Sequence, residues 1–189
     1  TARLSAELWN QVKNEDWAVV SESGNTSEWS HRLWDYNKHY QWIGSSGGAG
    51  VGYGAPAAVG GALAHRKHGR LPITIQGDGD FMYAPGVWWT AAHHKIPLLL
   101  IIHNNRAYHA EVMLVQRTAA RRGRGNDRVD IGNVIRDPAP DYAKIAQGYG
   151  VYAEGPISDP NALAPALERA LARVRAGEPA LLDVVSQPR

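Results

Sequence analysis

Two polar motifs in this chain follow apolar runs of the kind that form buried strands. They are Gly77-Asp78-Gly79-Asp80, after Ile73–Gln76, and Asn104-Asn105, after Leu98–His103. Asp78 offers a carboxylate oxygen and Asn105 an amide oxygen, and Mg²⁺ prefers such hard ligands, together with oxygens of a bound phosphate. Glycines beside Asp78 let the backbone approach a ligand and free its N–H groups for phosphate. Either motif alone is compatible with an ordinary turn, but the pair indicates a site for Mg²⁺ and a phosphorylated ligand.

The segments around these motifs alternate between strand-like and helix-like patterns. We expect strands at Trp17–Glu22, Ile73–Gln76, Leu98–His103, Gly150–Ala153 and Ala180–Val185. Helical spacing of apolar residues or helix-start signals predict helices at about 2–13, within 44–61, at 85–94, at 142–147 and at 163–174. The alternation predicts an α/β fold, a three-layer sandwich with a mainly parallel sheet and helices on both faces.

In such a sheet, ligands bind beyond the carboxyl ends of the strands. Three of the expected strands end in unusual loops, because Ser23-Gly24-Asn25 follows the first of them in the same way that the two motifs follow theirs. The positive end of the helix near Pro85 is a further source of attraction for an anion. We therefore expect these loops to converge on one ligand.

The composition describes one globular domain covering residues 1–189. Hydrophobic residues make up 44% and charged residues 20%, no cysteine is present, and the net charge is +2. These values exclude disulfides and thiolate metal sites and argue against a broad nucleic-acid surface. No apolar run reaches the roughly 20 residues of a membrane span, and we expect a cytoplasmic protein. Because residue 1 is Thr, we also expect a processed or excised piece of a longer polypeptide.

The motifs resemble those of a known family. Gly77-Asp78-Gly79, with Asn105 in an Asn pair 27 residues after Asp78, resembles the signature of thiamine diphosphate (ThDP) enzymes. The stretch from Gly48 to Ala58 is similar to the one that precedes this signature in the acetolactate synthase and benzoylformate decarboxylase group. The resemblance extends from about Trp17 to Val185. It implies that residues 1–189 form the C-terminal, diphosphate-binding domain of such an enzyme.

The resemblance also implies a role for each matching residue. The Asp78 and Asn105 side chains and the Ala107 carbonyl would ligate Mg²⁺, and Gly79 and Asp80 would offer backbone N–H groups to the diphosphate. Val51 would wedge between the cofactor rings, and the Ala49 carbonyl would accept a hydrogen bond from the exocyclic amine. The other positions expected to touch the cofactor are Asn25, Thr26, Gly77 and Tyr108.

Two positions depart from the family pattern. Val51 is smaller than the Met, Ile or Leu that often forms the wedge. Asp80 places a second carboxylate beside the diphosphate, which is repulsive unless that carboxylate turns away or binds another cation. We therefore expect Asp80 to act through its backbone only.

Three further groups of residues were weighed. His109 lies just past the metal motif and is a candidate for contact with substrate, with a packing or surface histidine as the alternative. The segment Gln116–Arg128 carries five arginines and two glycines and is expected to be a mobile surface loop. Trp29, Trp34 and Trp42 lie in a stretch without clear periodicity, which we expect to be buried against another domain.

The function that the resemblance implies is decarboxylation or carboligation of 2-oxo acids or related carbonyl compounds. In this family a glutamate from a separate pyrimidine-binding domain activates the cofactor, and that domain is absent from residues 1–189. We expect it on the same longer chain or on another subunit of a homo-oligomer, and the isolated domain to be nearly inactive. One alternative is the transketolase and oxo-acid dehydrogenase (E1) branch. The other is a nucleic-acid-binding module using Arg117, Arg121, Arg122, Arg124 and Arg128.

Overall fold

A parallel five-stranded sheet organises the chain. The computed structural model describes residues 1–22, 28–44 and 50–186. The strands are β1 (Trp17–Glu22), β2 (Leu71–Gly77), β3 (Leu98–Asn104), β4 (Tyr152–Ile157) and β5 (Pro179–Val185), in the order β1-β2-β3-β5-β4. All four pairings are parallel, so every strand ends at the same edge of the sheet. The last strand in sequence, β5, therefore lies beside β3.

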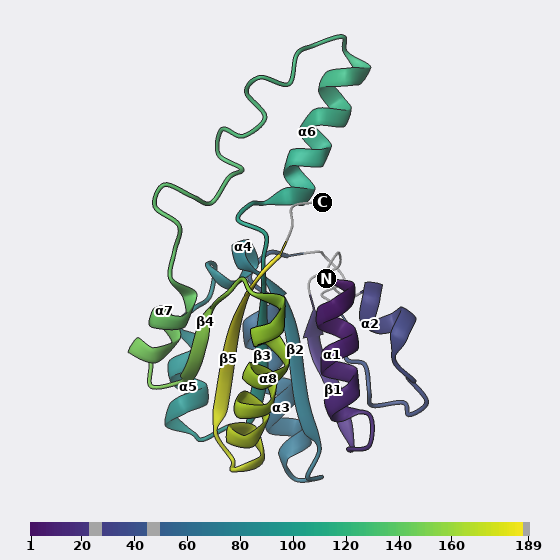
Figure 1. Ribbon diagram of the computed structural model, residues 1–189, viewed down its shortest axis with the longest axis vertical. Helices are drawn as coiled ribbons and strands as arrows, with labels where there is room; N and C mark the ends of the chain where they lie inside the picture. Colours follow the sequence, from purple (N-terminus) through teal and green to yellow (C-terminus); the bar gives the residue numbers. More distant parts are fainter. Residues whose placement is uncertain (23–27, 45–49, 187–189) are drawn as a thin grey trace.

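Helices cover both faces of this sheet (Figure 1). On one face lie α1 (Ala2–Val12) and α8 (Pro160–Arg175), with α2 (Glu28–Leu33) packed against α1. On the other face lie α3 (Gly54–Arg66), α5 (Val87–His93) and α7 (Tyr142–Gly148). The short helix α4 (Asp78–Phe81) follows β2 directly. This arrangement confirms the expected three-layer α/β sandwich.

The two faces carry separate cores because side chains alternate along each strand. Val19, Ile73, Ile101 and Leu182 belong to the core under α1 and α8, whereas Val20, Leu100 and Leu181 belong to the core under α3, α5 and α7. Both faces are therefore mainly apolar, which explains the largely apolar runs in the sequence. Leu8, at the centre of the α1 stripe, is fully buried in the first core.

The stretch that contains Trp29, Trp34 and Trp42 is part of this domain. The expectation that these tryptophans are buried against another domain is wrong for Trp34. That side chain is 5% exposed, and its indole N–H donates to the Ser5 carbonyl over 2.9 Å. Its ring packs at right angles to Trp17, and Trp42 also packs against this core. Trp29 lies in α2 rather than in an irregular segment. The stretch folds back because Trp42 forms a bridge to Val19 of β1.

The prediction of a loop at Gln116–Arg128 is also wrong for its first half, because α6 spans His109–Arg121. Residues 110–120 contain no Gly or Pro and include many strong helix formers, so local propensity outweighs the arginine content. Gly123, with φ of 62°, follows the end of the helix. The strand expected at Gly150–Ala153 begins two residues later, and the helix expected from Pro85 begins at Val87.

Helix α6 and the segment that follows it project beyond the carboxyl edge of the sheet (Figure 1). Val112 is the buried residue of α6, whereas Met113, Leu114 and Val115 are between 42% and 60% exposed. Within the described parts of the chain, no helix is long and apolar enough to cross a membrane. The exposed apolar side chains of α6 therefore lie on an arm that projects from the sheet.

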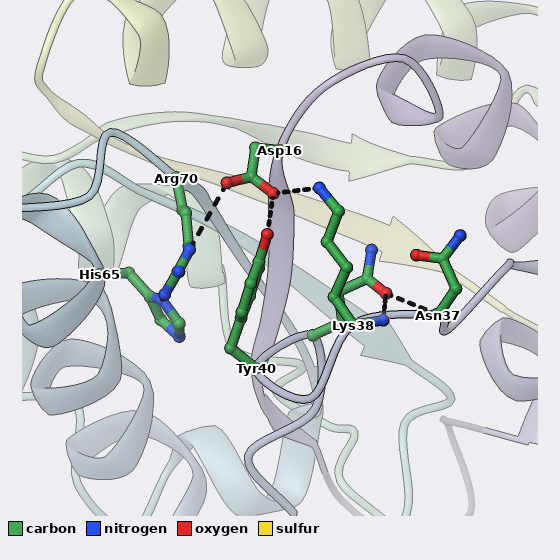
Figure 2. Close-up of polar contacts among 7 residues, drawn as sticks. Asp16, Asn37, Lys38, Tyr40, His65 and Arg70 are labelled. Carbon is green, nitrogen blue, oxygen red and sulfur yellow. Dashed lines mark hydrogen bonds and ion pairs between the residues drawn. The ribbon is translucent and has the colours of Figure 1, made fainter.

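A cluster of charged and aromatic side chains closes the opposite, amino edge of the sheet (Figure 2). The Asp16 carboxylate accepts hydrogen bonds from Lys38 over 2.8 Å and Tyr40 over 2.5 Å, which lower its pKa. The Arg70 guanidinium lies 3.4 Å from the centre of the Tyr40 ring and reaches His65 over 3.2 Å. These contacts tie the residues before β1 and β2 to the segment around Tyr40, so the cluster has a structural role.

The two-core arrangement makes a prediction about leucines on different helices. Leu8→Ala should lower the free energy of unfolding by about 2–5 kcal/mol, because it leaves a cavity in a closed core. Leu114→Ala, on the exposed face of α6, should change it by less than about 0.5 kcal/mol. Urea unfolding of both variants measures the difference. Equal effects would show that α6 is packed more tightly than its exposure indicates.

Candidate metal and cofactor site

The two polar motifs leave the sheet side by side. Gly77 at the end of β2 is in register with His103, one residue before the end of β3. The turn from Asn105 to Tyr108 therefore starts beside α4, so these two loops lie together as expected, and their convergence on one ligand remains a prediction. The expected cofactor residues Asn25, Thr26 and Ala49 lie outside the described residues.

Asp78 lies at the centre of this junction. It is the first residue of α4 and is 1% exposed. Burial raises the pKa of its carboxyl to about 6, although backbone N–H groups of Gly79, Arg106 and Asn105 hydrogen-bond to it and act in the opposite direction. Among the described residues, its Oδ2 atom is buried without a hydrogen-bond partner. A buried carboxylate oxygen in this state is destabilising unless a cation or a donor reaches it.

The turn after β3 is built by its own asparagines. The Asn104 side-chain oxygen accepts the Arg106 N–H over 3.2 Å, and the Asn105 oxygen accepts the Ala107 N–H over 3.0 Å. Arg106 has a φ of 61°, a left-handed conformation that is uncommon for a residue other than glycine. An amide oxygen has two lone pairs, so Asn105 retains one for a metal ion.

The backbone of Ala107 is oriented by an antiparallel bridge to Val134. The hydrogen bonds of this bridge are made by the neighbours, from Tyr108 N–H to Asn133 C=O and from Ile135 N–H to Arg106 C=O, both over 2.8 Å. In a pair of this type the bridged residue turns its own N–H and C=O groups away from the partner. The Ala107 carbonyl therefore points away from Val134 and is not used by this bridge, so it is available to a metal ion.

The Asp80 carboxylate is used for hydrogen bonds within the protein. It accepts the Gly52 N–H over 2.7 Å and the Gln76 side-chain N–H over 2.6 Å. Gly54 makes room for this contact, because a Cβ atom there would lie 2.5 Å from the Asp80 carboxylate. The side chain thus connects the turn at Val51 to α4, and this structural role was not expected from the sequence. Its backbone role toward a diphosphate remains a prediction.

Further residues that the sequence assigned to the site lie around this junction. Val51 lies in the turn before α3 and is 61% exposed, at a position held by the bond from Gly52 to Asp80. Gly79 lies under the Tyr108 ring, where a Cβ atom would be 2.5 Å from the ring. His109 is half-buried as the first residue of α6. The wedge role of Val51 and substrate contact by His109 remain predictions.

Sequence reasoning missed one buried acid beside the site. Asp183 in β5 is 1% exposed, and its Oδ1 accepts a hydrogen bond from the Asn104 side chain over 2.9 Å. Burial raises its pKa to about 6. The signal that was available is a charged residue inside the otherwise apolar run of β5. Gln76, a polar residue near the end of β2, gives the same kind of signal.

The oxygen donors at this junction fit Mg²⁺, which takes part of its shell from phosphate and water. They do not fit a metal ion that needs protein side chains for its whole shell. Within the described ranges, no three His, Asp or Glu side chains gather closely enough to hold an ion. The oxygens of Asp78, Asn105 and Ala107 leave a shell that phosphate and water would complete, which is how Mg²⁺ is usually bound. The orphaned Asp78 oxygen and the close glycine at position 79 fit a phosphorylated ligand carrying this ion.

Comparison with protein families decides the assignment. The family model of the thiamine pyrophosphate enzyme C-terminal TPP-binding domain matches residues 22–184. The chain belongs to this family. Thiamine pyrophosphate is another name for ThDP, so this TPP-binding domain is the one that the sequence motifs indicated.

Individual relatives of the TPP-binding domain carry related names. It is 35% identical over 146 residues to a Mycobacterium tuberculosis protein assigned as an acetolactate synthase large subunit, covering 77% of this chain and 27% of that protein. It is 36% identical over 138 residues to benzoylformate decarboxylase of Pseudomonas aeruginosa, covering 73% and 23%. The solved ThDP-dependent 4-hydroxybenzoylformate decarboxylase of Rhodococcus jostii matches with a TM-score of 0.80 and 27% identity, covering 99% and 33%. The chain thus spans a third or less of these relatives.

The raised pKa of Asp78 predicts how stability depends on pH. The carboxyl has a pKa of about 6 when folded and 3.8 ordinarily, so the folded state binds a proton more tightly than the unfolded state. As the pH rises from about 4 to about 6, the free energy of unfolding should therefore fall, by on the order of 2–3 kcal/mol from this group. Thermal unfolding of the metal-free chain and of Asp78→Asn measures this, because the variant lacks the contribution. Parallel pH profiles would contradict the assignment.

Proposed function

We propose that the chain binds ThDP through Mg²⁺ and forms part of an enzyme that decarboxylates or carboligates 2-oxo acids or related carbonyl compounds. The observation that carries this proposal is the buried, unpartnered oxygen of Asp78, which lies beside the turn that contains Asn105 and Ala107. The names of the relatives support the reaction class, because they include acetolactate synthase and benzoylformate decarboxylase.

In this proposal the chain holds the metal and the diphosphate end of the cofactor. Asp78 provides the charged ligand, the Asn105 side chain a neutral one, and the Ala107 carbonyl a third. The N–H groups of Gly79 and Asp80 would bind the diphosphate, with Gly77 and Tyr108 beside it. Asn25 and Thr26, which follow β1 in the sequence, would contribute further contacts. The Asp80 carboxylate already accepts hydrogen bonds from Gly52 and Gln76, which stabilise its charge and direct it toward the chain.

The ring end of the cofactor is assigned to the turn before α3. ThDP supplies a carbanion for attack on a carbonyl and an electron sink for loss of CO₂. Val51 would support the bent shape that this chemistry requires, and the Ala49 carbonyl would orient the exocyclic amine. The hydrogen bond from the Gly52 N–H to Asp80 ties the turn that contains Val51 to α4. We assign contact with the substrate at the mouth of the site to His109, the first residue of α6.

A pyrimidine-binding domain that provides an activating glutamate completes the proposal. The chain spans a third or less of its relatives, which leaves ample sequence for such a domain in proteins of this type. The exposed Met113, Leu114 and Val115 lie on the arm that begins directly after the metal turn. An apolar surface at this place supports contact with a further domain, on the same longer chain or on another subunit.

The metal assignment predicts the effects of two substitutions in the assembled enzyme. Asp78→Ala removes the charged ligand and should weaken Mg²⁺-dependent ThDP binding by more than the roughly 10–100-fold typical of an outer-shell residue. Asn105→Leu should have a smaller effect, because a neutral ligand is lost. Isothermal calorimetry with ThDP at fixed Mg²⁺ measures both. Asp159→Ala, which removes an exposed carboxylate at the start of α8, is the control. Unchanged affinity for Asp78→Ala would refute the site.

The division of the cofactor between two domains predicts weak binding by this chain alone. A ligand that keeps only half of its contacts still loses its translational and rotational freedom, so most of its affinity disappears. The purified 189-residue chain should show little turnover, and addition of the partner domain should restore it. Leu114→Asp on α6 should weaken this pairing, whereas Leu63→Asp, an equally exposed leucine on α3, should not. Full decarboxylation of a 2-oxo acid by the chain alone would contradict the proposed division.

A further inference from the structure

The buried acid Asp183 lies in the strand next to the metal turn. β5 is inserted between β3 and β4, and this order places Asp183 in register with Ile102 of β3. The side chain is closely covered from the side of β4, since a Cβ atom on Gly155 would lie 2.6 Å from the Asp183 Cβ. Asp183 therefore has little freedom to move away from β3.

The contact between Asp183 and Asn104 determines which way the asparagine amide faces. Asn104 is the last residue of β3, and both side chains are buried. An ionised carboxylate only accepts hydrogen bonds, so the Asn104 NH₂ group must face Asp183, over 2.9 Å. The amide oxygen then necessarily faces the other way, where it accepts the Arg106 N–H over 3.2 Å. The Asn104 backbone is also fixed, because its carbonyl accepts the Ser186 N–H over 2.8 Å.

The bond from Arg106 matters because the turn is locally unfavourable. Arg106 is left-handed, with a φ of 61°, and such a conformation persists only when its surroundings over-determine it. This conformation brings the N–H groups of Asn105 and Arg106 to the Asp78 carboxylate. It also places the Asn105 oxygen and the Ala107 N–H 3.0 Å apart. The position of the proposed ligands Asn105 and Ala107 thus depends in part on the Asn104 amide.

We propose that Asp183 is a positioning residue for the metal site. It orients the Asn104 amide, and Asn104 in turn holds the strained turn that presents Asn105 and Ala107 to Mg²⁺. This inference rests on the proposed binding of Mg²⁺ and ThDP. It assigns to β5 a role in metal affinity although no residue of β5 is a ligand in the proposed site.

The test measures the Mg²⁺ concentration that gives half-maximal ThDP binding in the assembled enzyme. Calorimetry measures this binding, and electron paramagnetic resonance measures it with Mn²⁺ in place of Mg²⁺. Asp183→Ala and Asn104→Ala should each raise this concentration by about 10–100-fold, as loss of an outer-shell partner does elsewhere. Asp183→Asn keeps an acceptor for the amide and should stay within about threefold of the unmodified protein. The double variant should be no worse than the more severe single one, because both act through one contact.

Leu181→Ala is the matched control. Leu181 lies in the same strand, on the same face as Asp183, and is fully buried. This substitution should lower the melting temperature without moving the Mg²⁺ dependence. If Asp183→Ala fails to fold, Asp183→Leu, of similar volume, takes its place, and Asn104→Ala carries the same test from the other side of the contact.

Three outcomes overturn the inference. They are an unshifted Mg²⁺ dependence in folded Asp183 and Asn104 variants, additive effects in the double variant, and an equal shift in Leu181→Ala. Asp78→Ala in the same titration separates the two levels of the argument. If Asp78→Ala leaves the Mg²⁺ dependence unchanged, the proposed metal site itself is wrong. If Asp78→Ala abolishes the Mg²⁺ dependence but the Asp183 variants show the same Mg²⁺ dependence as the unmodified protein, only the positioning role fails.

Discussion

The structure at the carboxyl edge depends on the burial of one carboxylate. Asp78 is placed where β2 ends and the chain turns into α4, and it is covered by the turn that follows β3. Backbone N–H groups from both segments face it, yet burial still outweighs them and one oxygen has no protein partner among the described residues. The protein thus maintains a destabilising charge at the meeting point of two strands. Such an arrangement is typical of sites where function takes precedence over stability.

The rest of the edge consists of contacts that hold backbone segments around this carboxylate. Asp80 connects the turn before α3 to α4 through Gly52, and Asn104 connects β5 to the turn after β3. Each connection uses a buried or half-buried side chain with a hydrogen bond to a backbone or amide group. The loops therefore belong to the scaffold as much as the strands do, which favours a site that is formed before a ligand arrives.

Much of the fold and part of the site could be predicted from the sequence because the signals are local. Largely apolar runs located β1, β3 and β5 to within a residue, and glycines beside Asp78 marked the strand end. The arginines after Gln116 were misleading, because composition suggested a loop where helix propensity prevails. The side-chain role of Asp80 and the pairing of Asp183 with Asn104 depend on residues distant in sequence. Only the order of strands in the sheet reveals that β5 lies beside β3.

The projecting arm has a consequence for how order spreads through the domain. An isolated helix as short as α6 is only marginally stable in water, and packing of one residue, Val112, adds little to it. Its helical content is therefore sensitive to whatever surface covers Met113, Leu114 and Val115. The helix starts one residue after Tyr108, whose N–H is bonded to Asn133 in the returning limb of the arm. Fraying of the arm is therefore linked to loosening of the turn at Ala107, and we infer that amide hydrogen exchange in these two segments changes together.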